Sequence, residues 1–185
     1  GGRVHDPPSL VVRHAERLVV PGVGNFGQAR RNLATSGLGD AIGEVATAGR
    51  PILGICLGMQ LFFETSEEGP DAPGLGLLRG EVRRFRTALS VPHVGWTAVS
   101  LSRGGAGHPM LAGLDPAGPV FFYHVHSYHP AALPEEEVLA TGTYGQVFPT
   151  IVGRGNVLGG QFHPEQAQRR RTNGLMVVVI TSPRR

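Results

Sequence analysis

Short apolar runs alternate with segments of helical apolar spacing along the first half of the chain. Residues 17–20, Arg-Leu-Val-Val, are followed by a Pro-Gly pair, and their apolar run is typical of a buried strand. Apolar residues then recur at helical spacing over 28–36 and 38–48, and Gly49 and Pro51 end the second of these segments. The first half therefore predicts strands that are each followed by helices.

The second half of the chain is dominated by strand signals. They gather in five segments, which are 81–101, 120–125, 138–143, 148–152 and 157–162. Strands alternating with helices imply a parallel sheet, and the later strand-rich half implies antiparallel additions. We predict an α/β fold with three layers, in which a mostly parallel open sheet has helices on both faces and antiparallel edge strands.

One cysteine occurs where a predicted strand turns directly into a predicted helix. The apolar run 51–54 precedes Cys56, helical spacing resumes at 59–64, and Gly54 and Gly58 flank the turn. This arrangement is typical of a nucleophile elbow, and a helix N-terminus favours the reactive thiolate. The same pattern also fits a buried structural cysteine that behaves as a small hydrophobic residue.

A second motif favours the catalytic interpretation. The sequence Gly-Gln-Phe-His-Pro-Glu occupies 160–165, directly after an apolar run that resembles a strand. A cysteine nucleophile needs a base that accepts its proton and a third group that orients the base. His163 can be that base and Glu165 the orienting group, because Pro164 stiffens the turn between them.

Composition limits the classes of protein that are possible. A length of 185 residues fits a single domain over 1–185, and no apolar run is long enough to span a bilayer. The net charge is +3, but the arginine clusters at 83–86 and 169–171 lack neighbouring aromatic sets, which argues against nucleic-acid binding. A single cysteine excludes an internal disulfide and favours a cytoplasmic location. No residue pattern indicates a cofactor or a metal site.

The two catalytic motifs together resemble those of class I glutamine amidotransferases. These enzymes share Gly-Ile-Cys-Leu-Gly-Met-Gln, at 54–60 here, and Gln-Phe-His-Pro-Glu, at 161–165. Pro-Gly-Val-Gly at 21–24, Pro-His-Val-Gly-Trp at 92–96 and the segment 122–128 narrow the resemblance to glutaminase subunits of imidazole glycerol phosphate synthase. The resemblance extends from about residue 19 to about residue 166, and it implies a flavodoxin-like sheet and a helix at the otherwise ambiguous residues 9–15.

The resemblance implies a Cys-His-Glu triad acting on glutamine. Two backbone N–H groups are expected to stabilise the oxyanion, one from Leu57 and one from the turn at Val23 and Gly24. The resemblance implies that this turn reorients when a partner docks. The remaining positions that resemble glutamine-holding residues are Gln60, His126, Ser127 and Tyr128. Taken alone, the glycines also fit an ordinary turn, and His126 and Tyr128 also fit an edge-strand pair.

The implied partner is a (β/α)₈-barrel cyclase subunit, which forms a heterodimer with the glutaminase and receives its ammonia. The cyclase products would be imidazole glycerol phosphate and an aminoimidazole carboxamide ribonucleotide. Two positions depart from the family, with Thr97 in place of asparagine and Gln166 in place of a lysine that faces the partner. The alternatives are a glutaminase subunit of another synthase, or an inactive fragment or binding module.

The resemblance also implies that the chain lacks the first strand, glycine-rich turn and helix of the domain. We expect such a chain to expose an unpaired sheet edge, because the missing strand would pair inside the sheet.

Overall fold

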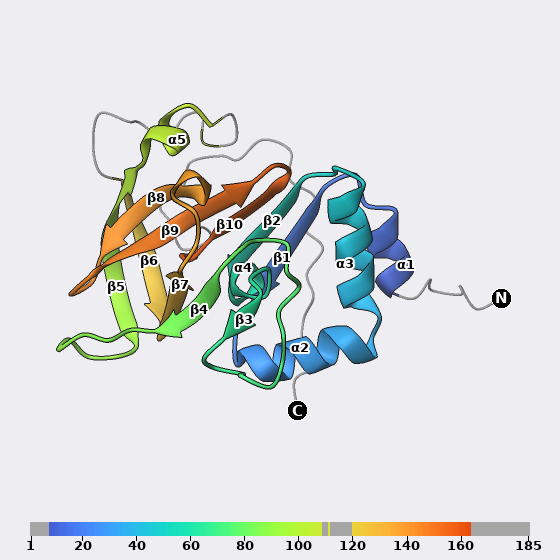
Figure 1. The fold of residues 1–185 in the computed structure, drawn as a ribbon, viewed down its shortest axis with the longest axis horizontal. Coiled ribbons are helices and arrows are strands. Elements are labelled where there is room, and N and C mark those ends of the chain that lie inside the picture. Colours follow the sequence, from blue (N-terminus) through green and yellow to red (C-terminus); the bar gives the residue numbers. More distant parts are fainter. Residues whose placement is uncertain (1–7, 109–110, 112–119, 164–185) are drawn as a thin grey trace.

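The computed structural model describes residues 8–108, 111 and 120–163 (Figure 1). The described strands are β1 (Leu18–Gly22), β2 (Ile52–Cys56), β3 (Thr65–Ser66), β4 (Glu81–Arg84), β5 (His93–Leu101), β6 (Val120–His126), β7 (Tyr128–Ala131), β8 (Val138–Thr143), β9 (Val147–Arg154) and β10 (Val157–Gly160). The helices are α1 (Pro8–Arg13), α2 (Phe26–Thr35), α3 (Leu38–Thr47), α4 (Leu57–Gln60), α5 (Arg103–Ala106) and the 3₁₀ turn Glu135–Glu137.

Seven of these strands form one sheet in the order β1-β2-β10-β9-β8-β5-β6, and β3-β4-β7 form a smaller sheet. β1, β2 and β10 are parallel, whereas the pairs from β10 through β6 are antiparallel. Helices α1, α2 and α3 lie at the β1 end of the sheet, and β5 and β6 lie at the other end (Figure 1). The predicted α/β class is confirmed, but the prediction of a mostly parallel sheet is wrong, because four of the six strand pairs in the large sheet are antiparallel.

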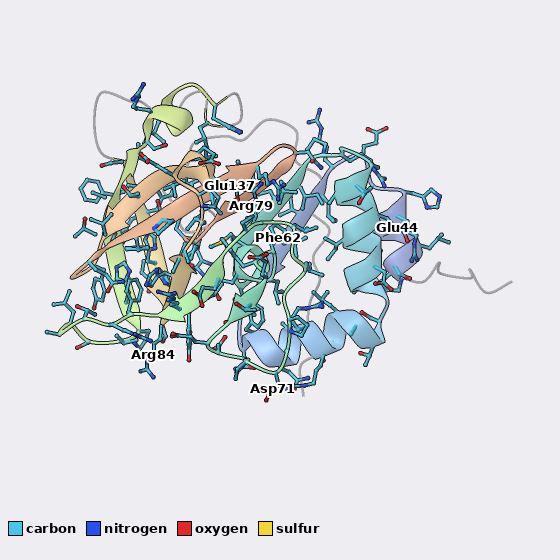
Figure 2. The ribbon with its side chains drawn as sticks, in the orientation of Figure 1. Glu44, Phe62, Asp71, Arg79, Arg84 and Glu137 are labelled. Atoms are coloured by element: carbon cyan, nitrogen blue, oxygen red, sulfur yellow. The ribbon has the colours of Figure 1, made fainter. Side chains whose placement is uncertain are left out.

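The main core lies around the parallel strands. Phe62 is fully buried near the middle of the molecule (Figure 2), together with Met59 and Phe63 from the segment that follows Cys56. Val12 of α1 and Val45 of α3 belong to the same core. Burial of Val12 explains why residues 9–15 contain a helix and no strand: one apolar face of α1 packs on α3.

The segment after Cys56 differs from its prediction. Helical structure was expected over 59–64, but α4 begins at Leu57 and ends at Gln60. The loop at 74–78 accounts for the early end, because its backbone donates hydrogen bonds to the carbonyls of Leu61, Phe62 and Phe63. Those carbonyls would otherwise accept bonds within a longer helix. Helix α2 begins earlier than expected, because the Asn25 side chain caps it by accepting a bond from the Gln28 N–H.

The antiparallel pair β5-β6 buries polar side chains and exposes apolar ones, the reverse of the usual arrangement. His93 pairs with His126 and Gly95 with His124, and all three histidines are buried. On the opposite face Val94 and Trp96 are exposed. Successive residues of a strand point to opposite faces, so one face of this pair buries histidines while the other presents apolar side chains to solvent.

Within the part of the chain that the structure describes, none of the helices combines the length and the apolar character that a membrane span requires.

Candidate active site

Cys56 adopts the backbone conformation of a nucleophile elbow. It is the last residue of β2 and the N-cap of α4, with φ of 53° and ψ of −116°. A positive φ is strained for a non-glycine residue, and it persists only where the surroundings impose it. The side chain is buried, with 7% of its surface exposed. The predicted elbow is therefore present.

Glycines allow the strands and helix to approach closely enough to hold this turn. A Cβ on Gly58 would lie 1.8 Å from the Val20 carbonyl oxygen, and one on Gly54 would lie 2.5 Å from the Cα of Met59. Both distances are shorter than any allowed contact. The two glycines that flank Cys56 therefore make room for the β1 and α4 backbones.

The predicted oxyanion-hole segments are neighbours. Gly22 at the end of β1 is opposite Cys56 in the parallel register, and a Cβ on Gly22 would lie 3.0 Å from the Leu57 Cβ. Val23 and Gly24 follow directly; Val23 is exposed, and Gly24 has a φ of +102° that favours glycine. The structure thus brings these segments together, and their role as oxyanion donors stays a prediction.

His163 reaches the same sheet edge as Cys56 from the adjacent strand. β10 is parallel to β2 with Gly160 opposite Ile55, so both strands end at one edge of the sheet. The His163 N–H donates to the Tyr123 carbonyl at 3.1 Å, which fixes the backbone at this position. The imidazole is buried. Glu165 lies outside the described residues, and so does Gln166, which differs from the family pattern.

Gln161 contacts Cys56, although no sequence motif predicted a role for it. Its side chain is fully buried, and its Nε2 donates to Cys56 Sγ at 3.8 Å. Its Oε1 accepts from Gln60 Nε2 at 3.1 Å, and Gln60 Nε2 also donates to the Tyr128 carbonyl at 3.0 Å. A polar chain therefore links Cys56, Gln161, Gln60 and Tyr128. The sequence feature that could have indicated this contact is the position of Gln161, directly after a buried strand and two residues before His163.

The segment between β6 and β7 is fixed by its carbonyl groups. The Tyr128 carbonyl accepts from His126 Nδ1 at 2.9 Å as well as from Gln60, and the Ser127 carbonyl accepts from the Phe85 N–H at 3.0 Å. Of the predicted glutamine-holding residues, Gln60 and His126 thus both bond the Tyr128 carbonyl, and Ser127 is bonded to Phe85. Their contact with a substrate stays a prediction.

Three buried histidines lie beside this segment. Burial is the main cause that lowers the pKa of His124 to about 3, and repulsion from His93 and His163 lowers it further. Burial also lowers the pKa of His126 and His93 below the ordinary value. These rings are therefore neutral at pH 7. One nitrogen from each of His93, His124 and His126 lies within 4.8 Å of the others, which makes them a group that could hold a metal ion.

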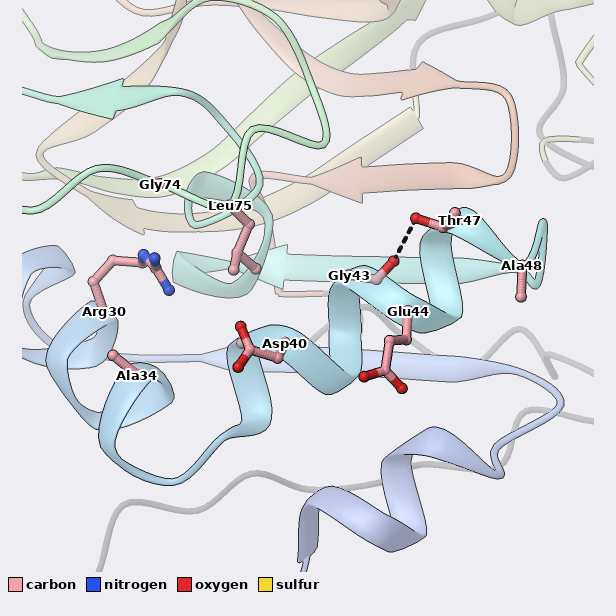
Figure 3. Close-up of a pocket in the computed structure, with 10 residues that line it drawn as sticks. Arg30, Ala34, Asp40, Gly43, Glu44, Thr47, Ala48, Gly74 and Leu75 are labelled. Atoms are coloured by element: carbon pink, nitrogen blue, oxygen red, sulfur yellow. Dashed lines mark hydrogen bonds between the residues drawn. The ribbon is translucent and has the colours of Figure 1, made fainter.

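The hollow in Figure 3 lies elsewhere. It has a volume of about 760 Å³ and opens between α2, α3 and the loop at Gly74 and Leu75. Arg30, Asp40 and Glu44 line it, and none of the predicted site residues does. Because it is open and charged and contains no nucleophile, it is not the site of the predicted chemistry.

Comparison with known proteins agrees with this geometry. The family profile of class I glutamine amidotransferases matches residues 9–177. The chain is 47% identical over 166 residues to imidazole glycerol phosphate synthase subunit HisH of Symbiobacterium thermophilum, covering 90% of this chain and 76% of that protein. It is 40% identical over 185 residues to the HisH subunit of Bacillus licheniformis, covering 94% and 83%. The chain belongs to the class I glutamine amidotransferase family, among its HisH subunits.

Solved structures of this family share the fold. A crystal structure of a glutamine amidotransferase superposes with a TM-score of 0.61 at 24% identity, covering 81% of this chain and 71% of that chain. The glutaminase domain of Trypanosoma brucei CTPS, solved with bound acivicin, gives a TM-score of 0.61 at 19% identity and covers 89% and 69%. The elbow, the parallel strands and the added antiparallel strands thus form a glutamine amidotransferase fold.

Proposed function

We propose that this chain is a glutaminase subunit that hydrolyses glutamine to glutamate and ammonia for imidazole glycerol phosphate synthesis. The observation that carries the proposal is the strained elbow at Cys56, beside the strand that leads to His163. Identities of 40–47% to HisH subunits support the same conclusion. They also favour imidazole glycerol phosphate synthesis over another synthase of the same fold.

In the proposed reaction the Cys56 thiolate attacks the side-chain carbonyl carbon of glutamine. The carbonyl electron pair moves onto oxygen and gives a tetrahedral oxyanion. His163, which has taken the thiol proton, delivers it to the departing nitrogen, so ammonia leaves and a glutamyl thioester forms. Water, deprotonated by His163, then attacks the thioester and releases glutamate. Glu165 orients the His163 ring in this scheme.

The oxyanion would be held by the Leu57 N–H and by an N–H of the turn at Val23 and Gly24. The register that places Gly22 opposite Cys56 supports this assignment, because it puts both segments next to the nucleophile. Removing one such donor typically costs about 2.7–4 kcal/mol of transition-state stabilisation. The Gln161 amide, which contacts Cys56 Sγ, would help to fix the thiolate before attack.

Free ammonia is largely protonated at neutral pH, and ammonium is not a nucleophile. The product is therefore useful only if it passes directly into a synthase. An exposed apolar face supports a (β/α)₈-barrel cyclase partner. This β5-β6 apolar face consists of Val94, Trp96, Phe121 and Val125, with Trp96 52% exposed. Clustered exposed aromatic and branched side chains are typical of protein interfaces. The heterodimer would act in the cytoplasm.

Ammonia release from glutamine tests the proposal. We expect turnover by the chain with a cyclase subunit and its nucleotide, and none by Cys56→Ala, while both proteins bind the cyclase equally. Wild-type-like turnover by Cys56→Ala would overturn the assignment of the nucleophile.

A further inference from the structure

Three histidine rings share one buried space behind the β5-β6 pair. His93 and His126 are directly opposite each other in the register, and His124 lies one pleat further along β6. The ring centroids are 5.0 Å apart for His93 and His124, 5.2 Å for His124 and His126, and 5.3 Å for His93 and His126. We call these residues the three-histidine cluster.

Hydrogen bonds determine which ring nitrogens carry protons. His126 Nδ1 contacts the Tyr128 carbonyl at 2.9 Å, so this nitrogen is the N–H donor and Nε2 holds a lone pair. His124 Nδ1 is 2.9 Å from His126 Nε2, so His124 donates from Nδ1 and its Nε2 also holds a lone pair. In ligating histidines the second nitrogen commonly donates to a backbone carbonyl, as it does in His126.

Two nitrogens of the cluster are left without partners. Among the described residues, no group forms a hydrogen bond with His124 Nε2 or with His93 Nδ1, and both atoms are buried. The other His93 nitrogen, Nε2, lies 2.8 Å from Thr97 Oγ1. A buried polar atom without a partner is unfavourable, and a bound cation would satisfy the lone pairs of these two nitrogens.

The distances fit a small divalent cation. Zinc–nitrogen bonds of 2.0–2.1 Å in a tetrahedral site place two ligand nitrogens roughly 3.3 Å apart. One nitrogen of each ring lies within 4.8 Å of the others. Small ring rotations therefore bring three imidazole nitrogens to one ion. Imidazole is a preferred ligand of zinc and related metals.

Aromatic side chains close the space around the rings. Tyr144 stacks on His93 with a centroid distance of 4.0 Å, and Phe148 lies edge-on to both His93 and His124. Phe85 lies against His126 at 5.4 Å. Such an apolar shell strengthens metal binding by excluding water, and it keeps the imidazoles in the neutral form that ligates metals.

We propose that His93, His124 and His126 form a binding site for a divalent transition metal of the zinc class, separate from the Cys56 nucleophile. Three protein ligands leave the fourth tetrahedral position open for a water molecule. The site would fix the strand pair that carries the β5-β6 apolar face on its other side.

Zinc titration of the full chain tests the site. The chain is first stripped of metal with a chelator, and Cys56→Ala serves as the starting protein, so that the thiolate cannot bind the ion. We expect one equivalent of Zn²⁺ to bind by calorimetry and to raise the melting temperature. Co²⁺ in place of Zn²⁺ should give visible absorption bands of a nitrogen-ligated, four-coordinate ion.

Two phenylalanine variants on the Cys56→Ala chain discriminate the site from adventitious binding. His124→Phe removes one ligand and should weaken Zn²⁺ binding by about 100-fold or more. His129→Phe is the matched control, because His129 is also buried and packs on Phe85 but lies outside the cluster; its Zn²⁺ affinity should be unchanged. If His124→Phe lacks a cooperative thermal transition, His93→Gln takes its place, since its amide can still bond Thr97.

The proposal is overturned by the absence of saturable Zn²⁺ binding, by equal affinity in Cys56→Ala and in the ligand variant, or by equal weakening in both phenylalanine variants. None of these results bears on glutamine hydrolysis, so the site and the proposed function fail separately.

Discussion

The two ends of the large sheet differ in strand direction and in the kind of side chain that they bury. At the parallel end, β1, β2 and β10 bring Cys56 and the strand before His163 to one edge, and glycines make the approach possible. At the antiparallel end, β5 and β6 bury histidines and expose apolar side chains. Close approach of the backbone determines the structure of the parallel end. At the antiparallel end, the feature that matters is the face of the sheet on which each side chain lies.

Under the proposed function, the parallel end carries the chemistry and the antiparallel end carries the docking surface. The elbow at Cys56 has a strained backbone, which persists because main chain packs closely on main chain around it. A docking surface requires exposed apolar area, which is unfavourable until a partner covers it. The two ends should therefore respond to different substitutions.

The largest effect is expected for His163→Asn at the parallel end. We predict a loss of about 10⁴-fold in glutamine hydrolysis with the partner present, because the thiol proton then has no acceptor. Glu165→Gln should lose less, since an amide still orients the ring. Ammonia release measures both variants. An alkylation pH profile of Cys56 that is identical in His163→Asn and wild type would show that this histidine does not activate the thiol.

The next effect concerns the packing that holds the elbow. Gly58→Ala places a Cβ against the Val20 carbonyl and should destabilise the fold by about 3 kcal/mol or more. Gly43→Ala is the matched control, because Gly43 lies inside α3 with open space around it. Alanine there should raise the free energy of unfolding by about 0.5–1 kcal/mol. Denaturant unfolding measures both. Equal stabilities would disprove the close-approach argument.

At the antiparallel end we expect Trp96→Ala to weaken cyclase binding by about 30-fold, corresponding to roughly 2 kcal/mol for a buried aromatic anchor. The stability of the isolated chain should fall by about 1 kcal/mol at most, because Trp96 is half exposed and loses only its edge contact with Tyr123. Val11→Ala on α1 removes an exposed apolar side chain at the other end of the molecule and should leave binding intact (Figure 1). Comparable losses in both variants would place the partner elsewhere.

Over one pH unit, the smallest effect is a pH dependence of stability at His124. The pKa of His124 is about 3 in the folded chain, whereas the unfolded chain takes up the proton near pH 6.5. The contribution of the neutral His124 ring to the free energy of unfolding is therefore fully present above pH 6.5. It is lost as the pH falls from 6.5 toward 3, by at most about 1.4 kcal/mol per pH unit.

His124→Phe should flatten this acid dependence between pH 6.5 and 5, and His14→Gln, which changes an exposed histidine, should not. Chemical unfolding at several pH values measures the slope. An unchanged slope in His124→Phe would show that burial does not exclude the proton from this ring.

The sequence predicted the parallel end far better than the antiparallel end. The elbow at Cys56 follows from local glycines and from the change of apolar period, so neighbouring residues determine it. The length of α4 was mispredicted because carbonyl partners arrive from the distant loop at 74–78. The contact of Gln161 with Cys56 also depends on strand order, since β10 returns beside β2 from the far end of the described chain.

The three-histidine cluster was not predictable for the same physical reason. His93 and His126 meet only because β5 and β6 pair in one register, and a shift by one residue would expose the histidines and bury the apolar face. The sequence pattern within each strand does not determine how the two strands are aligned. The predicted roles of Val23, Gly24, Leu57 and Glu165 stay predictions, although the first three lie in the segments around Cys56.

Covalent trapping with a glutamine analogue tests the central claim most directly. A chloroketone analogue alkylates a thiolate without needing an oxyanion hole, and mass spectrometry with peptide mapping locates the adduct. We predict one equivalent on Cys56, with protection by glutamine and slower labelling in His163→Asn. Labelling that glutamine does not slow, or an adduct on any other residue, would contradict the assignment of Cys56 as the nucleophile.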